Sequence, residues 1–286
     1  MEIGFIMVKS KKRLKLRLPR LRATKEEMWN TVEKIASLRQ FYHFVELKGT
    51  QTTEIHKHPL PTWDKIHPIL PSDISEMKCL DVGCNSGFYS LILAHNGAEV
   101  LGIDINQTDI DVVAQAKWLE SEFKTGAKFE NIGVLELDSK HHNKYDIIMF
   151  LGVYHHLPDT DSVLQKLNKL LKKDGMLFFG SATNRFGKSE YYAEDSADYA
   201  NDPYSYRVAT PEDILEDLVE NGFELVEEIP IDSSLYYGLC KKIKTTRKST
   251  TRFTPEKIAE MAEAQKKAKA AEEKKSKKTS KNLKSR

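Results

Sequence analysis

The sequence predicts an α/β protein built on a doubly wound, mostly parallel sheet of seven strands. Short strand-like apolar runs alternate with segments whose apolar residues recur at helical spacing, from about residue 78 onward. A tight, glycine-containing turn follows the first of these runs. The chain has 286 residues, of which 40% are hydrophobic and 30% charged, so it is long enough to bury a substantial core. Strands that alternate with helices form a parallel sheet covered on both faces.

Seven segments are expected to be strands because they are short, apolar and bounded by turn residues. They are residues 78–83, 98–105, 128–133, 145–152, 175–182, 223–229 and 235–243.

The segments between these runs are expected to be helices. The first helix begins at Thr24, and Glu27 lies three residues later, which is the spacing of a capping box. The other helical segments are residues 88–97, 109–123, 161–175 and 210–222. In segment 161–175 the apolar face comprises Val163, Leu164, Leu167, Leu170 and Leu171, and Gly175 is expected to follow the end of the helix.

Charge divides the chain into three parts. Residues 1–22 and residues 252–286 each carry a net charge of +7, whereas the whole chain carries +2, so the middle carries −12. We therefore expect a basic N-terminal arm, helix and lead-in segment over residues 1–60, a globular domain over 61–245 and a basic, low-complexity, disordered tail over 246–286. The basic ends either hold a polyanion such as RNA or are solvated tails that aid solubility.

Three cysteines, Cys79, Cys84 and Cys240, form no CxxC pair, which predicts reduced thiols in a cytoplasmic protein. No apolar run approaches the roughly 20 residues that span a bilayer, so no membrane association is expected. His56, His58, His141 and His142 have no acidic or cysteine partners at metal-ligand spacing, so no metal site is expected either.

The sequence CLDVGCNSGFYSL, residues 79–91, places a D-x-G-x-N-x-G turn directly after the first strand of the sheet. A dinucleotide-binding turn would have a third glycine at position 88, which is Phe here. Asn85 tolerates left-handed backbone angles, so the loop can still turn tightly and let a ligand approach its backbone. Asp104 ends the next strand, where a carboxylate can accept hydrogen bonds from both hydroxyls of a ribose. Together these features predict a site for a nucleoside-containing ligand.

These residues resemble the first two motifs of class I S-adenosylmethionine-dependent methyltransferases, which have a Rossmann-like fold. Three further stretches are similar to the wobble-uridine tRNA methyltransferase and carboxymethyltransferase family, whose members modify 5-hydroxyuridine. They are FYHFVELKG, TWDKIHPIL and YDIIMFLGVYHHLPDTDSVLQKL. The similarity covers roughly residues 40–230 and implies S-adenosylmethionine as the cofactor.

The resemblance also implies roles for individual residues. Asp81, Gly83, Asn85 and Gly87 would shape the methionine end of the cofactor site, and Asp104 would hold the ribose. Ile105 and Leu135 would flank the adenine, Trp63 and Lys65 would lie over the cofactor, and Leu151 would face the methyl group. The chain has His155 where carboxymethyl-transferring members have a Tyr, and no Arg in LYYGLC, so plain methyl transfer is expected.

Catalysis with a sulfonium cofactor is mainly positioning, but a hydroxyl nucleophile must lose its proton. His155 and His156 follow the fourth strand, so either could be the base, or could simply shape the loop. Tyr154 is a further candidate for lining the site. The tyrosine-rich stretch 182–209 is either a lid over the acceptor or a structural loop.

Three hypotheses remain open from the sequence. The chain is an enzyme that methylates an oxygen of a modified uridine in tRNA, an enzyme that methylates a small molecule or sugar, or a binding module without turnover. The intact set of Asp81, Gly83, Gly87 and Asp104 argues against the third. The basic ends favour tRNA over a small molecule.

Overall fold

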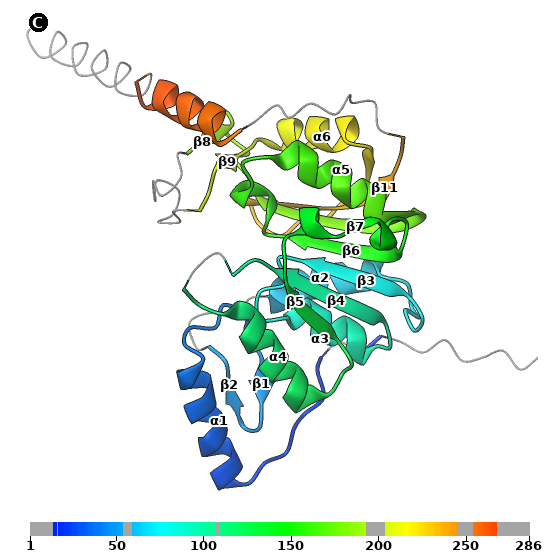
Figure 1. Ribbon diagram of the computed structural model, residues 1–286, viewed down its shortest axis with the longest axis vertical. Helices are drawn as coiled ribbons and strands as arrows, with labels where there is room; N and C mark the ends of the chain where they lie inside the picture. The colour runs from blue at the N-terminus through cyan, green and yellow to red at the C-terminus, as the bar shows by residue number, and fades with distance from the viewer. Residues whose placement is uncertain are drawn as a thin grey trace, which may run out of the picture. The chain divides into compact units, whose positions relative to one another are not determined.

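The computed structural model describes residues 14–15, 17–53, 59–106, 109–192, 204–244 and 254–267 (Figure 1). The chain divides into two compact units, which we describe separately. Unit 1 comprises Met1–Gly133 and Tyr145–Met149, and unit 2 comprises Val134–Lys144 and Phe150–Arg286. The division at residues 60/61 and 245/246 that the sequence predicts remains a prediction.

Unit 1 carries the N-terminal helix and the first strands of the large sheet. Its elements are α1 (Lys25–Ser37), β1 (Glu46–Leu47), β2 (Thr50–Gln51), α2 (Leu60–Ile66), the 3-10 turn η1 (His67–Ile69), β3 (Lys78–Val82), α3 (Phe88–His95), β4 (Glu99–Asp104), α4 (Val112–Phe123), β5 (Lys128–Asn131) and most of β6 (Tyr145–Leu151).

The predicted start of α1 is confirmed in atomic detail. The Thr24 side chain accepts a hydrogen bond from the Glu27 N–H at 3.2 Å, and the Glu27 carboxylate accepts one from the Thr24 N–H at 2.8 Å. This reciprocal pair satisfies two of the backbone donors that a helix start leaves without partners.

Unit 2 carries the rest of β6 and the C-terminal elements. They are η2 (Val134–Glu136), η3 (Ser139–His141), η4 (Tyr154–His156), α5 (Thr160–Leu170), β7 (Leu171–Ala182), β8 (Glu190–Tyr191), β9 (Arg207–Val208), α6 (Pro211–Glu220), β10 (Phe223–Glu228) and β11 (Leu235–Lys242). Residues 255–267 form a further helix.

The large sheet has seven strands in the order β10-β11-β7-β6-β3-β4-β5. Strand β4 runs parallel to β3 and β5, whereas β11 runs antiparallel to β7 and β10. The order reverses direction between β3 and β6, as it does in doubly wound folds. The predicted fold class is therefore confirmed, with the antiparallel pairs at one edge of the sheet.

The predicted end of the helix in segment 161–175 is wrong. Helix α5 ends at Leu170, and Leu171 is already extended and buried in β7, together with Gly175. The N–H groups of Asn143 and Lys144 donate to the carbonyls of Lys169 and Leu170, at 2.8 and 3.0 Å, which satisfies the last turn of the helix. Tertiary burial outweighs the local helical pattern here.

Residues 254–267 differ from the disordered tail expected over 246–286. Apart from Thr254 these residues are helical, and Ile258 and Ala262 are each only 1% exposed. Their apolar spacing is i, i+4, which places both side chains on one face of the helix. The other residues of the predicted tail lie outside the described residues.

Candidate active site

The loop between β3 and α3 is held in a left-handed backbone conformation at three positions. The φ angles are +70° at Gly83, +49° at Asn85 and +84° at Gly87. Glycine has no steric penalty there and Asn only a small one, which explains their presence in D-x-G-x-N-x-G. The N–H groups of Gly83 and Cys84 both donate to the Ile103 carbonyl, at 2.9 and 3.0 Å, so the loop is fixed to the end of β4.

Gly87 also meets a packing requirement. A Cβ atom built at this position would lie 2.8 Å from the Phe129 ring and 3.1 Å from the Ala116 side chain. Contacts this short do not occur without a shift of the neighbours. The glycine therefore allows α3 to begin close against α4 and β5.

Asp81 is buried beneath the loop. Its carboxylate accepts hydrogen bonds from the Ser90 N–H at 3.1 Å and from the Ser90 hydroxyl at 2.6 Å. Burial raises the pKa of Asp81 to about 7, although the hydrogen bonds from Ser90 oppose this shift. Asp81 thus links β3 to the first turn of α3, and its effect on a ligand is exerted through the loop.

Asp104 ends β4 and is hydrogen-bonded to the glycine loop. One of its oxygens accepts the Asn85 N–H at 2.9 Å and the other accepts the Asn106 N–H at 3.2 Å. A carboxylate has about four acceptor sites, so it can accept several hydrogen bonds at once. Next to it Ile105 is 57% exposed.

His43, which the sequence analysis did not single out, packs against the start of α3. Its Nδ1 accepts the Phe88 N–H at 3.4 Å, one of the donors that a helix start leaves without a partner. The ring also makes edge contacts with Phe88 and Tyr89, with centroids 6.3 and 6.1 Å away. Only one feature of the sequence could have pointed to His43, namely its place in FYHFVELKG, one of the stretches that resemble the methyltransferase family.

Trp63 and Lys65, which the resemblance places over the cofactor, lie on α2. The Trp63 side chain is fully buried, with ring centroids 6.0 Å from His67 and 6.4 Å from Tyr89, so it packs in the core of unit 1. Lys65, two residues later on the same helix, is exposed. The placement of these two residues over the cofactor remains a prediction.

In unit 2 the turn η4 carries the two adjacent histidines, whose ring centroids are 4.0 Å apart. The Nδ1 atom of His155 accepts the Ala182 N–H at 3.4 Å and lies 3.4 Å from the Ser181 hydroxyl. A backbone N–H can only donate, so the neutral ring carries its proton on Nε2. Burial and the neighbouring His156 hold the pKa of His155 well below its usual value, so this ring is a neutral hydrogen-bond donor.

His156 has the opposite tautomer. Its Nδ1 lies 3.2 Å from the carbonyl oxygen of Tyr204, and a carbonyl can only accept, so Nδ1 carries the proton. The lone pair of the neutral ring is then on Nε2. In the neutral state the two rings of the turn thus carry their protons on different nitrogens.

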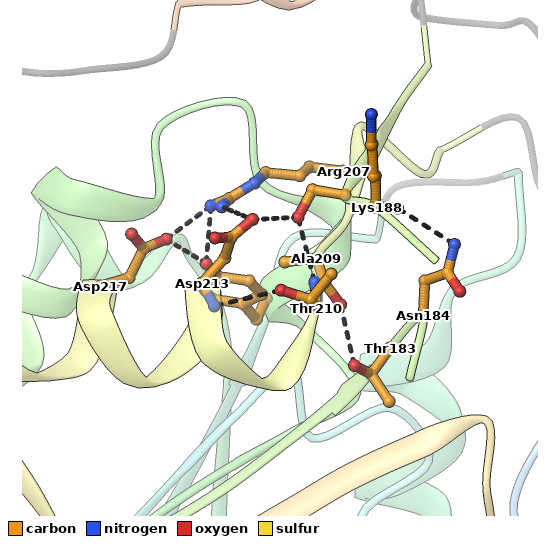
Figure 2. Close-up of polar contacts among 10 residues, drawn as sticks. Thr183, Asn184, Lys188, Arg207, Ala209, Thr210, Asp213 and Asp217 are labelled. Carbon is orange, nitrogen blue, oxygen red and sulfur yellow. Dashed lines mark hydrogen bonds and ion pairs between the residues drawn. The ribbon is translucent and has the colours of Figure 1, made fainter. Parts of the chain in front are cut away.

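Tyr154, a sequence-based candidate for lining the site, begins the turn η4. Its side chain is fully buried, and its hydroxyl donates to Asp217 and accepts from Arg207 at 2.9 Å. Figure 2 shows Arg207 above α6, where it pairs with Asp217 at 2.5 Å and with Asp213 at 3.6 Å. Tyr154 is a member of this buried cluster and fixes the start of the histidine turn.

The stretch 182–209 is described at both of its ends. Strands β8 and β9 pair there as a short antiparallel hairpin. The Thr183 hydroxyl donates to the Ala209 carbonyl at 2.8 Å, and the Asn184 side chain donates to the Lys188 carbonyl at 3.0 Å (Figure 2). Residues 193–203, in the middle of this stretch, lie outside the described residues.

The two remaining predicted site residues are in unit 2. Leu135, on η2, is 52% exposed, and Leu151 is half-buried at the end of β6. Among the described residues no group of three or more His, Cys, Asp and Glu side chains could hold a metal ion. In the same part of the chain no helix is long and apolar enough to cross a membrane.

Comparison with known proteins identifies the family. A family model described as a methyltransferase domain matches residues 55–228, which is more than half of the chain. The chain belongs to this family. The prediction of a methyltransferase is thus confirmed at the level of the family, and S-adenosylmethionine is the methyl donor that the resemblance implies.

The methyltransferase is similar to ubiquinone biosynthesis O-methyltransferases. It is 31% identical over 154 residues to the protein from Acinetobacter baylyi, an alignment that covers 52% of this chain and 63% of the other. It is 36% identical over 123 residues to the protein from Leptothrix cholodnii, with 43% and 51% covered. The chain thus spans less than two thirds of the length of these relatives.

Solved structures show the same fold at low sequence identity. The N-terminal domain of EvdMO1 in the presence of S-adenosylhomocysteine and D-fucose has a TM-score of 0.58 and 14% identity, covering 78% of this chain and 98% of that chain. A Burkholderia thailandensis 1,6-didemethyltoxoflavin-N1-methyltransferase has a TM-score of 0.51 and 20% identity, covering 80% and 94%. At these identities the likeness concerns the fold alone.

Unit 1 fits S-adenosylmethionine in three respects. The left-handed backbone at Gly83 and Gly87 keeps side chains away from the loop, Asp104 places a carboxylate at the end of β4 and Ile105 offers an exposed apolar surface. The buried Ser86 hydroxyl, in the middle of the loop, has no hydrogen-bond partner among the described residues. A buried hydroxyl without a hydrogen-bond partner destabilises the folded protein, unless a ligand or a water molecule bonds to it.

Proposed function

We propose that this methyltransferase transfers a methyl group to a hydroxyl oxygen of a small molecule. The observation that carries the proposal is the pair of complementary tautomers on η4, because a hydroxyl nucleophile needs both a proton acceptor and a donor that orients it. The names of the related ubiquinone biosynthesis O-methyltransferases support an oxygen of a small molecule as the acceptor.

The cofactor residues have distinct proposed tasks. When bound, S-adenosylmethionine supplies a methyl group on a sulfonium, which is intrinsically reactive toward an aligned nucleophile. Asp104 would accept the ribose hydroxyls, and Ile105 would provide apolar surface for the adenine. The loop from Gly83 to Gly87 would hold the methionine part through its backbone.

The acceptor residues have proposed tasks that follow from their tautomers. Nε2 of His156 would take the proton of the acceptor hydroxyl, and Nε2–H of His155 would donate a hydrogen bond to the acceptor. The Tyr204 carbonyl would stabilise the protonated His156 through the Nδ1–H. This assignment gives the base to His156, whereas the sequence left either histidine eligible.

A tRNA acceptor is a second candidate, supported by the resemblance to the wobble-uridine family and by the basic ends of the chain. Residues 1–22 and 252–286 each carry a net charge of +7. Lysine and arginine side chains at such density attract phosphates in a salt-dependent way. Most of these residues lie outside the described part of the chain.

Transfer of isotope-labelled methyl groups tests the proposal and separates the two acceptors. The enzyme is incubated with labelled S-adenosylmethionine and, in parallel, with catechols and other small phenols, with sugars, and with bulk tRNA. We expect label in a small hydroxylated molecule, and a loss of this label in His156→Gln. Label that appears only in tRNA would overturn the small-molecule proposal in favour of the second candidate.

A further inference from the structure

The helix of residues 255–267 is packed against the hairpin β8–β9 by one face (Figure 1). Ile258, which is 1% exposed, forms an apolar cluster with Tyr206, and Tyr191 and Met261 pack against this cluster. Ala262, one turn further along, is also 1% exposed. The helix is therefore a covered element of unit 2, although it lies in a stretch of low-complexity sequence.

A polar contact fixes the same helix to the edge of β8. The Gln265 side-chain oxygen accepts the Tyr191 N–H at 3.2 Å. Gln265 follows Ile258 by seven residues, so it lies on the same face of the helix as Ile258 and Ala262. Glu260 and Ala264, in contrast, are exposed. One face thus contacts the hairpin through both apolar and polar groups.

The chain segment under the helix also holds the histidine turn. The Tyr206 N–H donates to the His155 carbonyl at 2.8 Å, and the Tyr204 carbonyl lies 3.2 Å from Nδ1 of His156. The Tyr206 carbonyl in turn accepts the Tyr192 N–H at 2.9 Å. Residues 204–206 therefore hydrogen-bond to both histidines. The Tyr206 side chain of this segment packs against Ile258 of the helix.

The hairpin has a second attachment on the side of α6. Arg207 is bonded to Asp217 and Tyr154, and its guanidinium lies 5.9 Å from the centre of the Tyr191 ring. Val208 and Tyr192 form a second buried cluster with Ala182 of β7. A hairpin of two short strands is only marginally stable unless it packs against another element. The helix supplies this packing on the side of Tyr206 and Tyr191.

We infer that the helix of residues 255–267 is a positioning element for the acceptor side of the enzyme. Ile258, Ala262 and Gln265 hold residues 204–206 in place, and this segment holds the backbone of His155 and fixes the orientation and the tautomer of His156. The inference rests on the proposed function, because it takes these histidines to face the acceptor. It assigns a role to a helix that lies outside the matched methyltransferase region, which ends at residue 228.

A matched pair of substitutions tests the inference. Ala262→Asp puts a carboxylate into the covered face, whereas Ala264→Asp puts the same group on the exposed face of the same helix. We expect Ala262→Asp to lower kcat about 10- to 100-fold, as small displacements of catalytic groups do, with an unchanged Kd for S-adenosylmethionine. Ala264→Asp should behave as the wild type. Equal kcat values in the two variants would overturn the inference.

Two truncations test the same link between the helix and the histidine turn, and they need no methyl acceptor. Removal of residues 268–286 keeps the helix, whereas removal of residues 254–286 deletes it. Only the second should accelerate hydrogen exchange at the Tyr192 and Tyr206 amides and remove the Nδ1–H signal of His156 from the nitrogen NMR spectrum. Unchanged exchange and an unchanged His156 signal in the second truncation would overturn the inference, whatever the activity.

The two readouts distinguish a failure of the inference from a failure of the proposed function. If the exchange and the His156 signal respond as expected but the wild type labels no hydroxylated small molecule, the positioning role stands and the proposed acceptor is wrong. Binding of S-adenosylmethionine is the check that each variant is folded. Should the longer truncation fail this check, Ile258→Thr replaces it as a milder loss of the same contact.

Discussion

The glycine loop after β3 and the histidine turn after β6 are both short, but they are held in place in different ways. The loop is fixed by partners near in sequence, such as Ser90 on Asp81 and Asp104 on Asn85. The turn is fixed by partners far along the chain, Ala182 and Tyr204. The shape of the glycine loop is thus set by residues close to it in the sequence. The proton positions on the two histidines depend instead on contacts that only the tertiary fold creates.

The largest effect should come from the base in the histidine turn. His156→Gln removes a proton acceptor, so kcat should fall about 10²- to 10⁴-fold if His156 is the general base. His155→Gln, the matched control, replaces a ring that is not the proposed base with an amide that can still donate and accept, so it should cost about 1 kcal/mol, or roughly fivefold. The check is kcat for the acceptor identified above, with Kd for S-adenosylmethionine measured beside it. A larger loss in the His155 variant would show that the tautomer assignment is reversed.

The buried carboxyl under the glycine loop should make stability depend on pH. Its pKa is about 7 in the folded protein and 3.8 for an ordinary Asp, so the folded state binds the proton more tightly. The contribution of protonated Asp81 to the free energy of unfolding is thus fully present below about pH 4, and is lost as the pH rises toward 7. Three pKa units correspond to about 4 kcal/mol.

Asp81→Asn, which cannot ionise, isolates this contribution. Relative to the wild type, the free energy of unfolding of the variant should rise by up to about 4 kcal/mol between pH 4 and pH 8. Urea unfolding at the two pH values measures the difference. A difference between variant and wild type that does not change with pH would mean that Asp81 is ionised at both values and compensated by Ser90.

The smallest of the three effects tests the packing of the glycine loop. Gly87→Ala should destabilise the fold by about 2–4 kcal/mol, because the new Cβ adds overpacking against Phe129 to the cost of a left-handed backbone. Gly126 is the control, since its φ is +94° but a Cβ there would meet nothing within 4 Å. Gly126→Ala should cost only about 1–2 kcal/mol. Equal losses of unfolding free energy would leave no role for the contact with Phe129.

Most of the fold and several local features of the glycine loop could be predicted from sequence. The capping box at Thr24, the left-handed Asn85 and the acid at the end of β4 are local features, and local features leave a pattern in the chain. The burial of Trp63 and Tyr154, the early end of α5 and the cover over Tyr206 could not be predicted. Each of these depends on residues that are brought together only by the tertiary structure.

The buried pair of Arg207 and Asp217 has a consequence for the response of unit 2 to heat. Burying two charges is costly mainly because water solvates them so well, and that solvation becomes less favourable as temperature rises. The net contribution of this pair therefore improves on warming, whereas hydrophobic stabilisation levels off. Residue 207 should accordingly remain attached to α6 at temperatures where the apolar contact between Ile258 and Tyr206 has already begun to open.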